Sequence, residues 1–282
     1  MTTAPIPRFA VIGHPVAHSQ SPWIHHAFGQ QTGIALKYEK ILAPLDGFRA
    51  TVDTFFGEGG RGLNVTLPFK EETWTLAGER LSPRARLAGA ANTLWIDASG
   101  AIHACNTDGA GLVMDLERLG HAPRGRRVLL LGAGGAARGA LPALLEAGSA
   151  RVHVANRSPE KAERLCADMA DYAVDVPRSA GALTTIAGQW DLVINATSSS
   201  LSAHRPLAVQ LSYAAGALAY DMVYAAQETA FLGEARRQGA ASCADGLGML
   251  VGQAAVSFEI WHGVRPRIAP VLQALRRHLM QQ

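Results

Sequence analysis

The chain has 282 residues, which favours two domains at about 150 residues each. Its 48% hydrophobic and 17% charged residues exclude a disordered chain, and 29 glycines without a fixed period exclude collagen and solenoid repeats. The longest apolar stretch, near 128–137, is far shorter than the roughly 18 residues of a membrane span. The first residues carry no secretory signal, and three cysteines at unrelated spacings give no disulfide framework. We expect a globular cytoplasmic protein.

The net charge of +3 does not indicate a nucleic-acid partner. The 26 basic residues are interleaved with acids and form no stripe with aromatic residues. We therefore expect neither nucleic acid nor a membrane as a partner. Only four of the 26 are lysines: Lys37, Lys40, Lys70 and Lys161. An isolated lysine in an apolar loop, such as Lys70, is thus a candidate functional group.

The first hundred residues alternate between strand-like and helix-like segments. Strands are predicted at 8–13, 35–41 and 62–66, followed by a hairpin at 91–97 and 101–105. Helices are predicted at 22–32, 44–56 and 68–77. The first helix has Ser21 as its expected N-cap and Pro22 at its first position. This alternation predicts a sheet covered by helices.

A second pattern begins near residue 108. Helices are predicted at 109–119, 136–147 and 159–170, and continuous apolar strands at 126–131, 151–156, 191–196 and 217–222. Apolar strands separated by helices indicate a parallel sheet that is buried on both faces. Two further helical patterns, about 246–262 and 267–279, have no strand between them, so we expect them to pack back onto the first domain.

A glycine-rich loop lies directly between a predicted strand and a predicted helix, in the sequence GAGGAARG at 132–139. Glycines permit a tight turn and a close approach of the backbone to a pyrophosphate, and the following helix N-terminus favours negative charge. In this strand–loop–helix context the loop predicts dinucleotide binding. The expected contacts are Gly132, Ala133, Gly134, Gly135 and Ala136.

The end of the next strand favours NADP over NAD. An NAD site would place an acidic residue about 20 residues after the loop, to bind the ribose hydroxyls. Here Asn156, Arg157 and Ser158 take that place, followed by Lys161. The two cations suit a 2′-phosphate, although Ser158 can equally cap the 159–170 helix.

Polar residues gather where the elements of the first hundred residues end. They are Ser19, Ser21, Asn64, Thr66, Lys70 and Asn92, followed by Asn106, Thr107 and Asp108. Such side chains suit a small hydroxylated ligand. Taken singly, each also has a structural explanation: Ser21 and Asp108 as helix caps and Asn92 as a turn residue.

Among these residues, Lys70 and Asp108 are the most specific candidates for a catalytic pair. Reduction of a ketone by hydride leaves an alkoxide that must be protonated, and an ammonium held by a carboxylate can supply that proton. No metal site is expected, because His14 and His18 lie in a proline-containing loop and no CxxC or HExxH motif occurs. A nucleophilic serine at Ser198–Ser200 is not expected either, since no GxSxG motif surrounds it.

These residues resemble the shikimate dehydrogenase family. The resemblance spans essentially the whole chain in the stretches 13–28, 64–71, 88–94, 106–112, 132–139, 155–158, 195–201, 220–224 and 245–263. Several are long and specific, for example GHPVAHSQSPWIHHAF at 13–28 and NVTLPFKE at 64–71.

The resemblance implies a two-domain α/β protein. It assigns residues 1–107, completed by the C-terminal helices 247–282, to a substrate-binding domain, and residues 108–246 to a Rossmann-like NADP-binding domain. It implies that Ser19, Ser21 and Tyr224 bind the substrate carboxylate, and that Asn64, Thr66, Asn92 and Gln253 contact hydroxyls or the carboxylate. It also makes Lys70 and Asp108 the proton-transfer pair, and it places Met222 and Gly246 at the nicotinamide.

The expected activity is the reversible NADPH-dependent reduction of 3-dehydroshikimate to shikimate, a step of aromatic amino-acid biosynthesis, by a monomer or homodimer. One alternative is a broader quinate/shikimate dehydrogenase that also uses NAD. Another is a non-catalytic sensor of cofactor or substrate, which loss of Lys70 or Asp108 would mark; both residues are present.

Overall fold

The structure is a computed structural model that describes residues 5–197, 209–225 and 227–281. It confirms the predicted α/β class, with one mixed five-stranded sheet and one parallel six-stranded sheet. The chain divides into two compact units, residues 1–107 with 253–277 (unit 1) and residues 108–252 with 278–282 (unit 2). Residues Ser198–Ser200, considered above as a nucleophile, lie outside the described residues.

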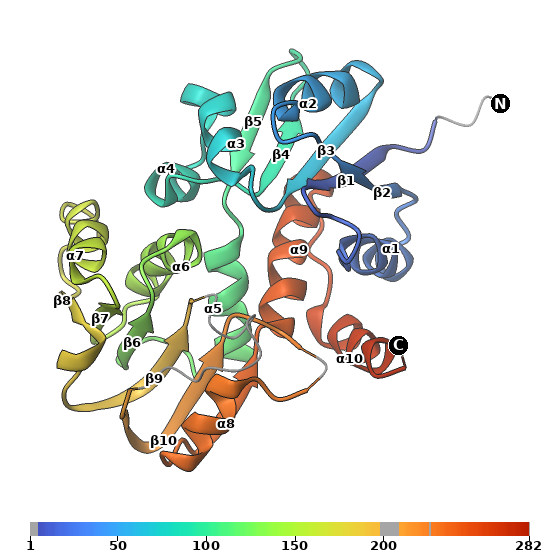
Figure 1. Ribbon diagram of the computed structural model, residues 1–282. Helices are drawn as coiled ribbons and strands as arrows, with labels where there is room; N and C mark the ends of the chain where they lie inside the picture. The colour runs from blue at the N-terminus through green and yellow to red at the C-terminus, as the bar shows by residue number, and fades with distance from the viewer. Residues whose placement is uncertain (1–4, 198–208, 226, 282) are drawn as a thin grey trace. The chain divides into compact units, whose positions relative to one another are not determined.

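Unit 1 is built on a sheet with the strand order β2-β1-β3-β4-β5 (Figure 1). Its strands are β1 (Arg8–Gly13), β2 (Lys37–Leu42), β3 (Gly60–Val65), β4 (Thr93–Ile96) and β5 (Ile102–Cys105). The central β1 pairs in parallel with β2 and β3, and β4 and β5 form the predicted antiparallel hairpin. The carboxyl ends of β1 and β3 therefore lie side by side at one edge of the sheet.

Helices cover both faces of this sheet. They are α1 (Ser21–Thr32), α2 (Phe48–Gly57), α3 (Lys70–Ala77) and α4 (Pro83–Ala88), with most of α9 (Leu247–His262) and α10 (Ile268–Leu279). Alternate residues of β1 enter two separate cores, Phe9 with Tyr38 and Trp261, and Ile12 with Phe48. A strand covered on both faces has no polar side, which explains the continuous apolar run.

Unit 2 holds a parallel sheet with the strand order β11-β10-β9-β6-β7-β8. The strands are β6 (Arg127–Leu131), β7 (Arg151–Asn156), β8 (Arg178–Ala182), β9 (Gln189–Asn195), β10 (Ser212–Asp221) and β11 (Ser242–Asp245). The order runs outward in both directions from β6 and β9, which is the doubly wound arrangement of dinucleotide-binding folds. Ligands in such sheets bind at the carboxyl ends of the strands beside this reversal point.

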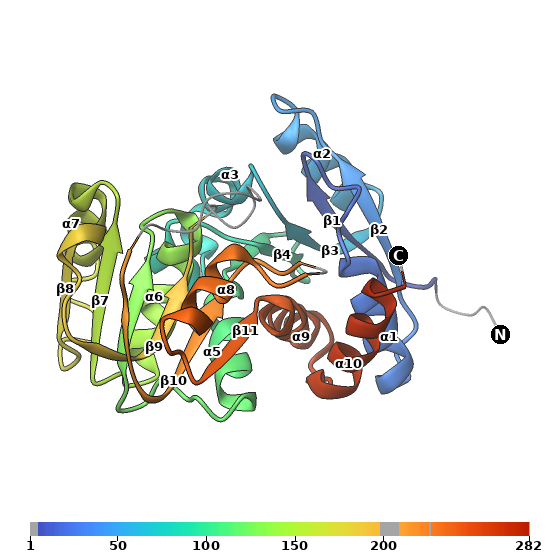
Figure 2. The same cartoon turned by 60° about the horizontal axis from the view of Figure 1, so that its bottom comes forward.

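The helices of unit 2 pack on its sheet. They are α5 (Asp108–Arg118), α6 (Gly135–Glu146), α7 (Pro159–Ala167) and α8 (Ala230–Arg237), with the first residues of α9. α5 and α6 lie side by side in Figure 1, and Figure 2 shows α7 beside β7 and β8. Phe231 and Leu232 of α8 pack against Leu129, Leu131 and Ala219 of the sheet.

Some predicted boundaries are wrong for local reasons. The helix expected at 44–56 begins at Phe48, because residues 44–47 form a turn in which the Gly47 amide donates to the Pro44 carbonyl. The expectation that Ser21 is an N-cap is also wrong, since α1 begins at Ser21 and Gln20 is its N-cap.

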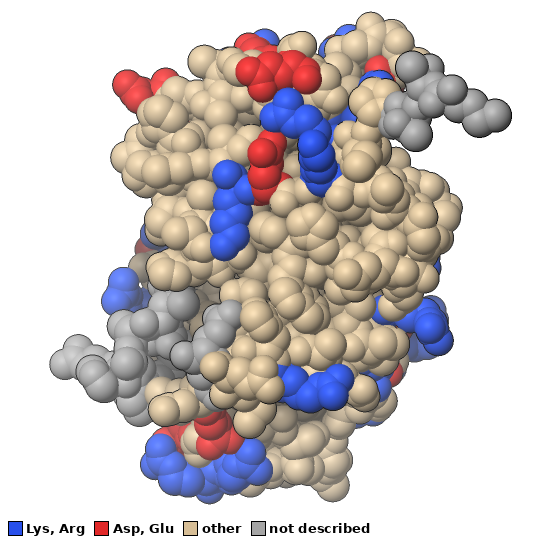
Figure 3. Space-filling model, turned by 90° about the vertical axis from the view of Figure 1, so that its right-hand side faces the viewer, with Lys and Arg blue, Asp and Glu red and all other residues tan. Residues whose placement is uncertain are grey.

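The described helices include none that is long and apolar enough to cross a membrane. On the face drawn in Figure 3, basic and acidic side chains lie together in small groups, and uncharged surface separates these groups. Among the described residues, charged side chains form ion pairs such as Arg236 with Glu228 and Arg265 with Glu259.

Candidate functional site

The loop after β1 carries two of the predicted substrate ligands, Ser19 and Ser21. The Ser19 hydroxyl oxygen accepts a hydrogen bond from the Ser21 amide at 3.3 Å, and the Ser19 hydroxyl donates to Ser21 Oγ at 3.2 Å. Ser21 opens α1, so its hydroxyl lies at a helix N-terminus, where amide groups favour negative charge. This arrangement suits a carboxylate.

The loop after β3 carries Thr66 and Lys70. The Thr66 amide donates to the Ile12 carbonyl, and the His14 amide donates to the Leu67 carbonyl, so the loops after β1 and β3 are joined by hydrogen bonds. Lys70 is the first residue of α3 and is half-buried. The structure thus brings Ser19, Ser21, Thr66 and Lys70 to the same edge of the unit 1 sheet.

Three predicted ligands, Asn64, Asn92 and Gln253, belong to one buried polar cluster in unit 1. Asn92 Nδ2 donates to Gln253 Oε1 at 3.4 Å, and Asn64 Nδ2 donates to the Asn92 carbonyl at 3.3 Å. Asn92 Oδ1 accepts from both the amide and the hydroxyl of Thr107, at 2.8 and 3.1 Å. The cluster joins β3, the turn before β4, the end of β5 and α9.

Asn64 is held differently from the other two. Its Oδ1 accepts from the Tyr38 hydroxyl at 2.7 Å and from His25 Nε2 at 3.1 Å. Its Nδ2 lies 2.9 Å from Ser257 Oγ and 3.3 Å from Thr93 Oγ1. A carboxamide offers two hydrogens and two lone pairs. Tyr38 and His25 occupy the lone pairs, and Ser257, Thr93 and the Asn92 carbonyl share the two hydrogens, so all four positions are used.

The turn at 89–92 connects Lys70 to the start of α5. The Ala91 amide donates to the Lys70 carbonyl at 2.9 Å, and the neighbouring Asn92 side chain holds Thr107. Asp108 follows Thr107 directly and is the half-buried first residue of α5, in unit 2. One short turn of unit 1 therefore fixes the backbone of Lys70 and the position of Thr107, the last residue of that segment of the unit.

The glycine-rich loop of unit 2 has the form predicted for a phosphate site. Gly132 directly follows β6 and has a φ of 106°, a conformation that favours glycine. Gly134, Gly135 and Ala136 are exposed where α6 begins, and Gly134 is the N-cap. The first amides of this helix are thus directed at solvent beside the reversal point of the sheet, where a pyrophosphate can be bound.

Two exposed cations follow the carboxyl end of β7, Arg157 in the loop and Lys161 in the first turn of α7. Arg157 and Lys161 are exposed, and Asn156 Nδ2 donates to the Ser158 carbonyl at 3.0 Å. Ser158 is the N-cap residue of α7. The loop and the first turn of α7 therefore each present one positive side chain, Arg157 and Lys161, which suits a phosphate monoester.

Met222 and Gly246 also lie together in unit 2. The Gly246 amide donates to the Val223 carbonyl at 3.1 Å, and a Cβ at position 246 would lie 2.2 Å from the Met222 carbonyl oxygen. Only glycine fits this close approach. Tyr224 follows two residues after Met222, and burial raises the pKa of its hydroxyl.

The sequence reasoning missed two buried carboxylates of unit 2. Asp221 Oδ1 accepts from Asn195 Nδ2 and the Val223 amide, and its Oδ2 accepts from the Thr229 hydroxyl. Asp115 accepts from the Tyr220 hydroxyl at 2.8 Å and from Arg118. An acidic residue inside an otherwise apolar strand or helix face was the available signal.

It also missed the side chains that hold the amide cluster of unit 1, namely His25, Tyr38, Thr93 and Ser257. Ser257 follows Gln253 by four residues on α9, so helical spacing could have placed both on one face. Tyr38 and His25 gave no such signal, because their partner Asn64 is 26 and 39 residues away.

Family models and known proteins match most of this chain. Three family models match: the substrate binding domain of shikimate dehydrogenase over residues 11–94, shikimate/quinate 5-dehydrogenase over 117–213, and the C-terminal domain of shikimate 5′-dehydrogenase over 246–276. The shikimate dehydrogenase (NADP(+)) of Bordetella petrii is 60% identical over 282 residues, which cover 98% of each chain.

Solved structures are similar over nearly the whole chain. An Ael1 enzyme from Pseudomonas putida has a TM-score of 0.88 and 46% identity, covering 95% of this chain and 98% of its own. Shikimate 5-dehydrogenase from Thermus thermophilus, in complex with NADP(H) and shikimate, has a TM-score of 0.83 and 34% identity, covering 97% and 100%. The chain therefore belongs to the shikimate dehydrogenase family.

Proposed function

We propose that this chain catalyses the reversible NADPH-dependent reduction of 3-dehydroshikimate to shikimate. Its family membership and the NADP(+)-dependent dehydrogenases it matches support this activity. We further assign substrate binding to unit 1 and cofactor binding to unit 2.

The residues of unit 2 fit NADP. The exposed start of α6 after Gly132 suits the pyrophosphate, and Arg157 and Lys161 suit the 2′-phosphate. The contacts that we propose are Gly132, Ala133, Gly134, Gly135, Ala136, Asn156, Arg157, Ser158 and Lys161, with Met222 and Gly246 at the nicotinamide. When bound, the nicotinamide supplies the hydride that reduces the ketone carbon.

Unit 1 suits the substrate. Ser19 and Ser21, at the start of α1, bind the carboxylate, and Tyr224 donates a third hydroxyl to it. Thr66, Asn92 and Gln253 orient the ring hydroxyls, since hydroxyl and amide groups can each donate and accept. Protein groups fill all the hydrogen-bonding positions of Asn64, so we do not assign it a contact with the substrate.

Lys70 and Asp108 handle the proton. In the reduction, the Lys70 ammonium donates a proton from Nζ to the oxygen that becomes the alcohol, and solvent reprotonates the amine. The Asp108 carboxylate accepts a hydrogen bond from Lys70 Nζ and, once the alcohol has formed, from its hydroxyl. In the oxidation of shikimate each proton movement is reversed.

The observation that carries this proposal is the double role of the turn at 89–92. Its Ala91 amide holds the Lys70 backbone, and its Asn92 side chain holds Thr107, which is covalently joined to Asp108. Holding the Lys70 backbone in this way supports a catalytic role, because small misplacements of a reacting group are costly to the reaction rate.

The test is the rate of NADPH formation, followed by absorbance, when the purified chain is mixed with shikimate and NADP+. We expect turnover with shikimate and NADP+, and a much lower kcat/KM when quinate replaces shikimate or NAD+ replaces NADP+. Comparable turnover of quinate would favour a broader quinate/shikimate dehydrogenase. Binding of both ligands without turnover would favour a sensor and would refute the proposed activity.

A further inference from the structure

Five buried side chains form a continuous network around Asn64, here called the Asn64 network: His25, Tyr38, Asn64, Thr93 and Ser257. Each is at least nine-tenths buried. They come from five different elements of unit 1, namely α1, β2, β3, β4 and α9. The network therefore fastens α1 and α9 to three strands of the sheet.

The backbone fixes which way the Asn64 carboxamide points. The Asn92 carbonyl can only accept a hydrogen bond, so the end of Asn64 that lies 3.3 Å from it must be the Nδ2 group. Oδ1 then points to Tyr38 and His25, and both must donate to it. His25 must therefore carry its hydrogen on Nε2.

The His25 ring is suited to this fixed role. It is fully buried and stacks on the Tyr38 ring with the centroids 4.4 Å apart and the planes 8° apart. Burial lowers its pKa to about 3, so the ring stays neutral and Nε2 remains a single donor at physiological pH. Stacking and donation together hold the Asn64 oxygen from one side.

At the Nδ2 end of Asn64, Ser257 links Asn64 to the predicted ligands Asn92 and Gln253. Ser257 Oγ lies 2.8 Å from Thr93 Oγ1 and 3.1 Å from the Gln253 carbonyl oxygen, one helical turn earlier on α9, and Thr93 Oγ1 lies 3.1 Å from Asn92 Oδ1. The two hydroxyl hydrogens are shared among these three contacts. The network thus ends on both residues that carry amide groups for the substrate.

We propose that His25, Tyr38 and Ser257 are positioning residues, which act through Asn64 to hold the amide groups of Asn92 and Gln253 ready for the hydroxyls of the substrate. This inference rests on the proposed function. A network of apolar residues of equal size would pack as well, but it would not fix the direction of an amide. In this arrangement Asn64 itself makes no contact with the substrate.

Single-atom changes test the network with little change in packing. Tyr38→Phe removes one donor to Asn64 Oδ1, and Ser257→Ala removes the nearest acceptor of Asn64 Nδ2, at 2.9 Å. We expect each to raise the KM for shikimate about tenfold or more and to lower kcat, while the KM for NADP+ stays within twofold. Ser257→Thr keeps the hydroxyl and should recover most of the lost kcat/KM.

Matched controls use hydroxyls outside the network. Ser149 is a buried serine of unit 2 whose Oγ donates to the Leu144 carbonyl at 2.8 Å. Tyr213 is a half-buried tyrosine on β10. Ser149→Ala and Tyr213→Phe should leave the KM for shikimate within twofold, even where they lower the Tm.

A double-mutant cycle tests whether Tyr38 acts through Asn64. In an Asn64→Ala background, Tyr38→Phe should change the KM for shikimate by less than twofold, because the oxygen that it orients is gone. Multiplicative effects of the two changes would show that Tyr38 acts independently, which would overturn the inference.

Three results separate the inference from the proposed function. If the wild-type chain neither binds nor oxidises shikimate, the proposed function fails and the inference falls with it. If the wild type is active but Tyr38→Phe and Ser257→Ala both keep the KM for shikimate within twofold, the inference alone is overturned. Equal increases in the KM values for shikimate and NADP+ would show a purely structural role, and would also overturn it.

Discussion

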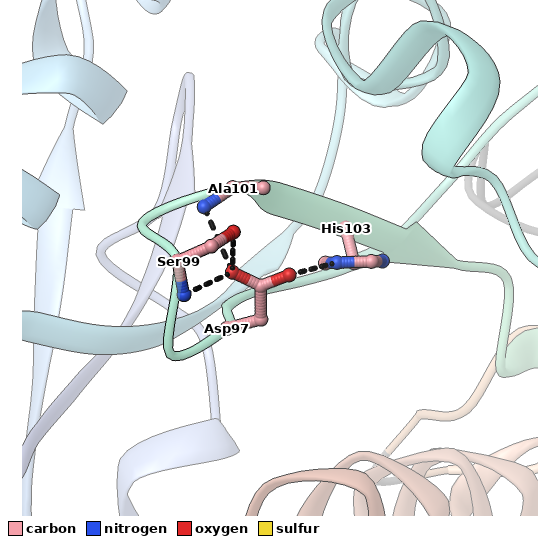
Figure 4. A network of polar contacts seen from close by, with 4 residues as sticks. All are labelled: Asp97, Ser99, Ala101 and His103. Atoms are coloured by element: carbon pink, nitrogen blue, oxygen red, sulfur yellow. Dashed lines mark hydrogen bonds and ion pairs between the residues drawn. The ribbon is translucent and has the colours of Figure 1, made fainter.

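The Asp97 carboxylate is the centre of a hydrogen-bond network at the tip of the β4–β5 hairpin (Figure 4). Its Oδ1 accepts from the amide and hydroxyl of Ser99, at 2.8 and 2.6 Å, and from the Ala101 amide at 3.0 Å. Its Oδ2 lies 2.8 Å from His103 Nε2. The Ser99 hydroxyl, followed by His103 and the Ala101 amide, holds the pKa of this carboxyl well below its ordinary value.

Asp97→Asn should lower the Tm at pH 7. Because the pKa is lower in the folded chain, the stabilisation is fully present above the ordinary carboxyl pKa of about 4 and is lost as the pH falls through the folded value. The Tm difference between wild type and variant, measured by calorimetry, should therefore shrink below about pH 4. Asp53→Asn, which removes an exposed ion pair with Arg49 on α2, should lower the Tm at pH 7 less than Asp97→Asn does. A Tm difference that stays constant down to about pH 2 would contradict this explanation.

The side chains that the sequence could predict are those that follow buried strands. Ser19, Thr66 and Lys70 were found because polar residues after an apolar run mark the carboxyl end of a strand. The Asn64 network could not be found in this way, since Asn64 and Ser257 are 193 residues apart and meet only once the unit folds. Long-range pairing of polar groups leaves no periodic trace in the sequence.

Predicted elements were most accurate where the apolar run was longest. The strands β1, β6 and β9 agree with prediction because they are buried on both faces. The short elements α4, β8 and β11 were missed, and so was α8. β8 reads RSAGA and β11 reads SCAD, and both are edge strands without a buried residue, so no apolar run marks them. The motif Ser82-Pro83 marked the start of α4, where Ser82 accepts from the Ala85 amide.

The loop after β7 should set the choice of cofactor. Arg157→Ala combined with Lys161→Ala should raise the KM for NADP+ about tenfold or more and leave the KM for NAD+ within twofold, because only NADP+ carries the 2′-phosphate. Arg151→Ala is the control, since Arg151 lies at the opposite end of β7, 4.7 Å from the centroid of the Trp190 ring. Steady-state kinetics with both cofactors gives the comparison. Equal increases in the KM values for NADP+ and NAD+ would show that these cations lie outside the 2′-phosphate site.

The loop after β6 should depend on glycine at its first position. A Cβ at Gly132 would lie 3.0 Å from Thr197 Cγ2 and 3.2 Å from the Ala196 carbonyl, and its φ of 106° is unfavourable for alanine. Gly132→Ala should raise the Kd for NADP+ about tenfold, measured by calorimetric titration, because the loop must shift. Gly100→Ala places the same strain at the hairpin tip, with a φ of 85° and open space around it, and should not change this Kd. A Gly132→Ala variant with the wild-type Kd would show that the loop does not bind the cofactor.

Each unit has an apolar core of its own. Ile12, Phe48 and Phe69 belong to a core of unit 1, whereas Leu129, Val193 and Phe231 belong to the core of unit 2. Because these cores lie inside their own units, we expect a ligand to protect the unit that binds it. The first amides of a helix have no acceptor within the helix, so they are sensitive reporters of a bound anion.

Hydrogen exchange measured by mass spectrometry should separate the two ligands. NADP+ alone should slow exchange at the start of α6 and around 156–161, and shikimate alone should slow exchange at the start of α1 and around 64–70. Omitting each ligand in turn provides the control. Protection by NADP+ at the start of α1 rather than α6 would reverse our assignment of the units.

The most direct test of the proposed chemistry is the turnover of Lys70→Ala. We predict that kcat for shikimate oxidation falls about 1000-fold, since proton transfer loses its positioned group, while the Kd for NADP+ stays within twofold. Lys37→Ala, which changes an exposed lysine at the start of β2, should keep the wild-type kcat. A Lys70→Ala variant that forms NADPH from shikimate at the wild-type rate would contradict the role of Lys70 in proton transfer.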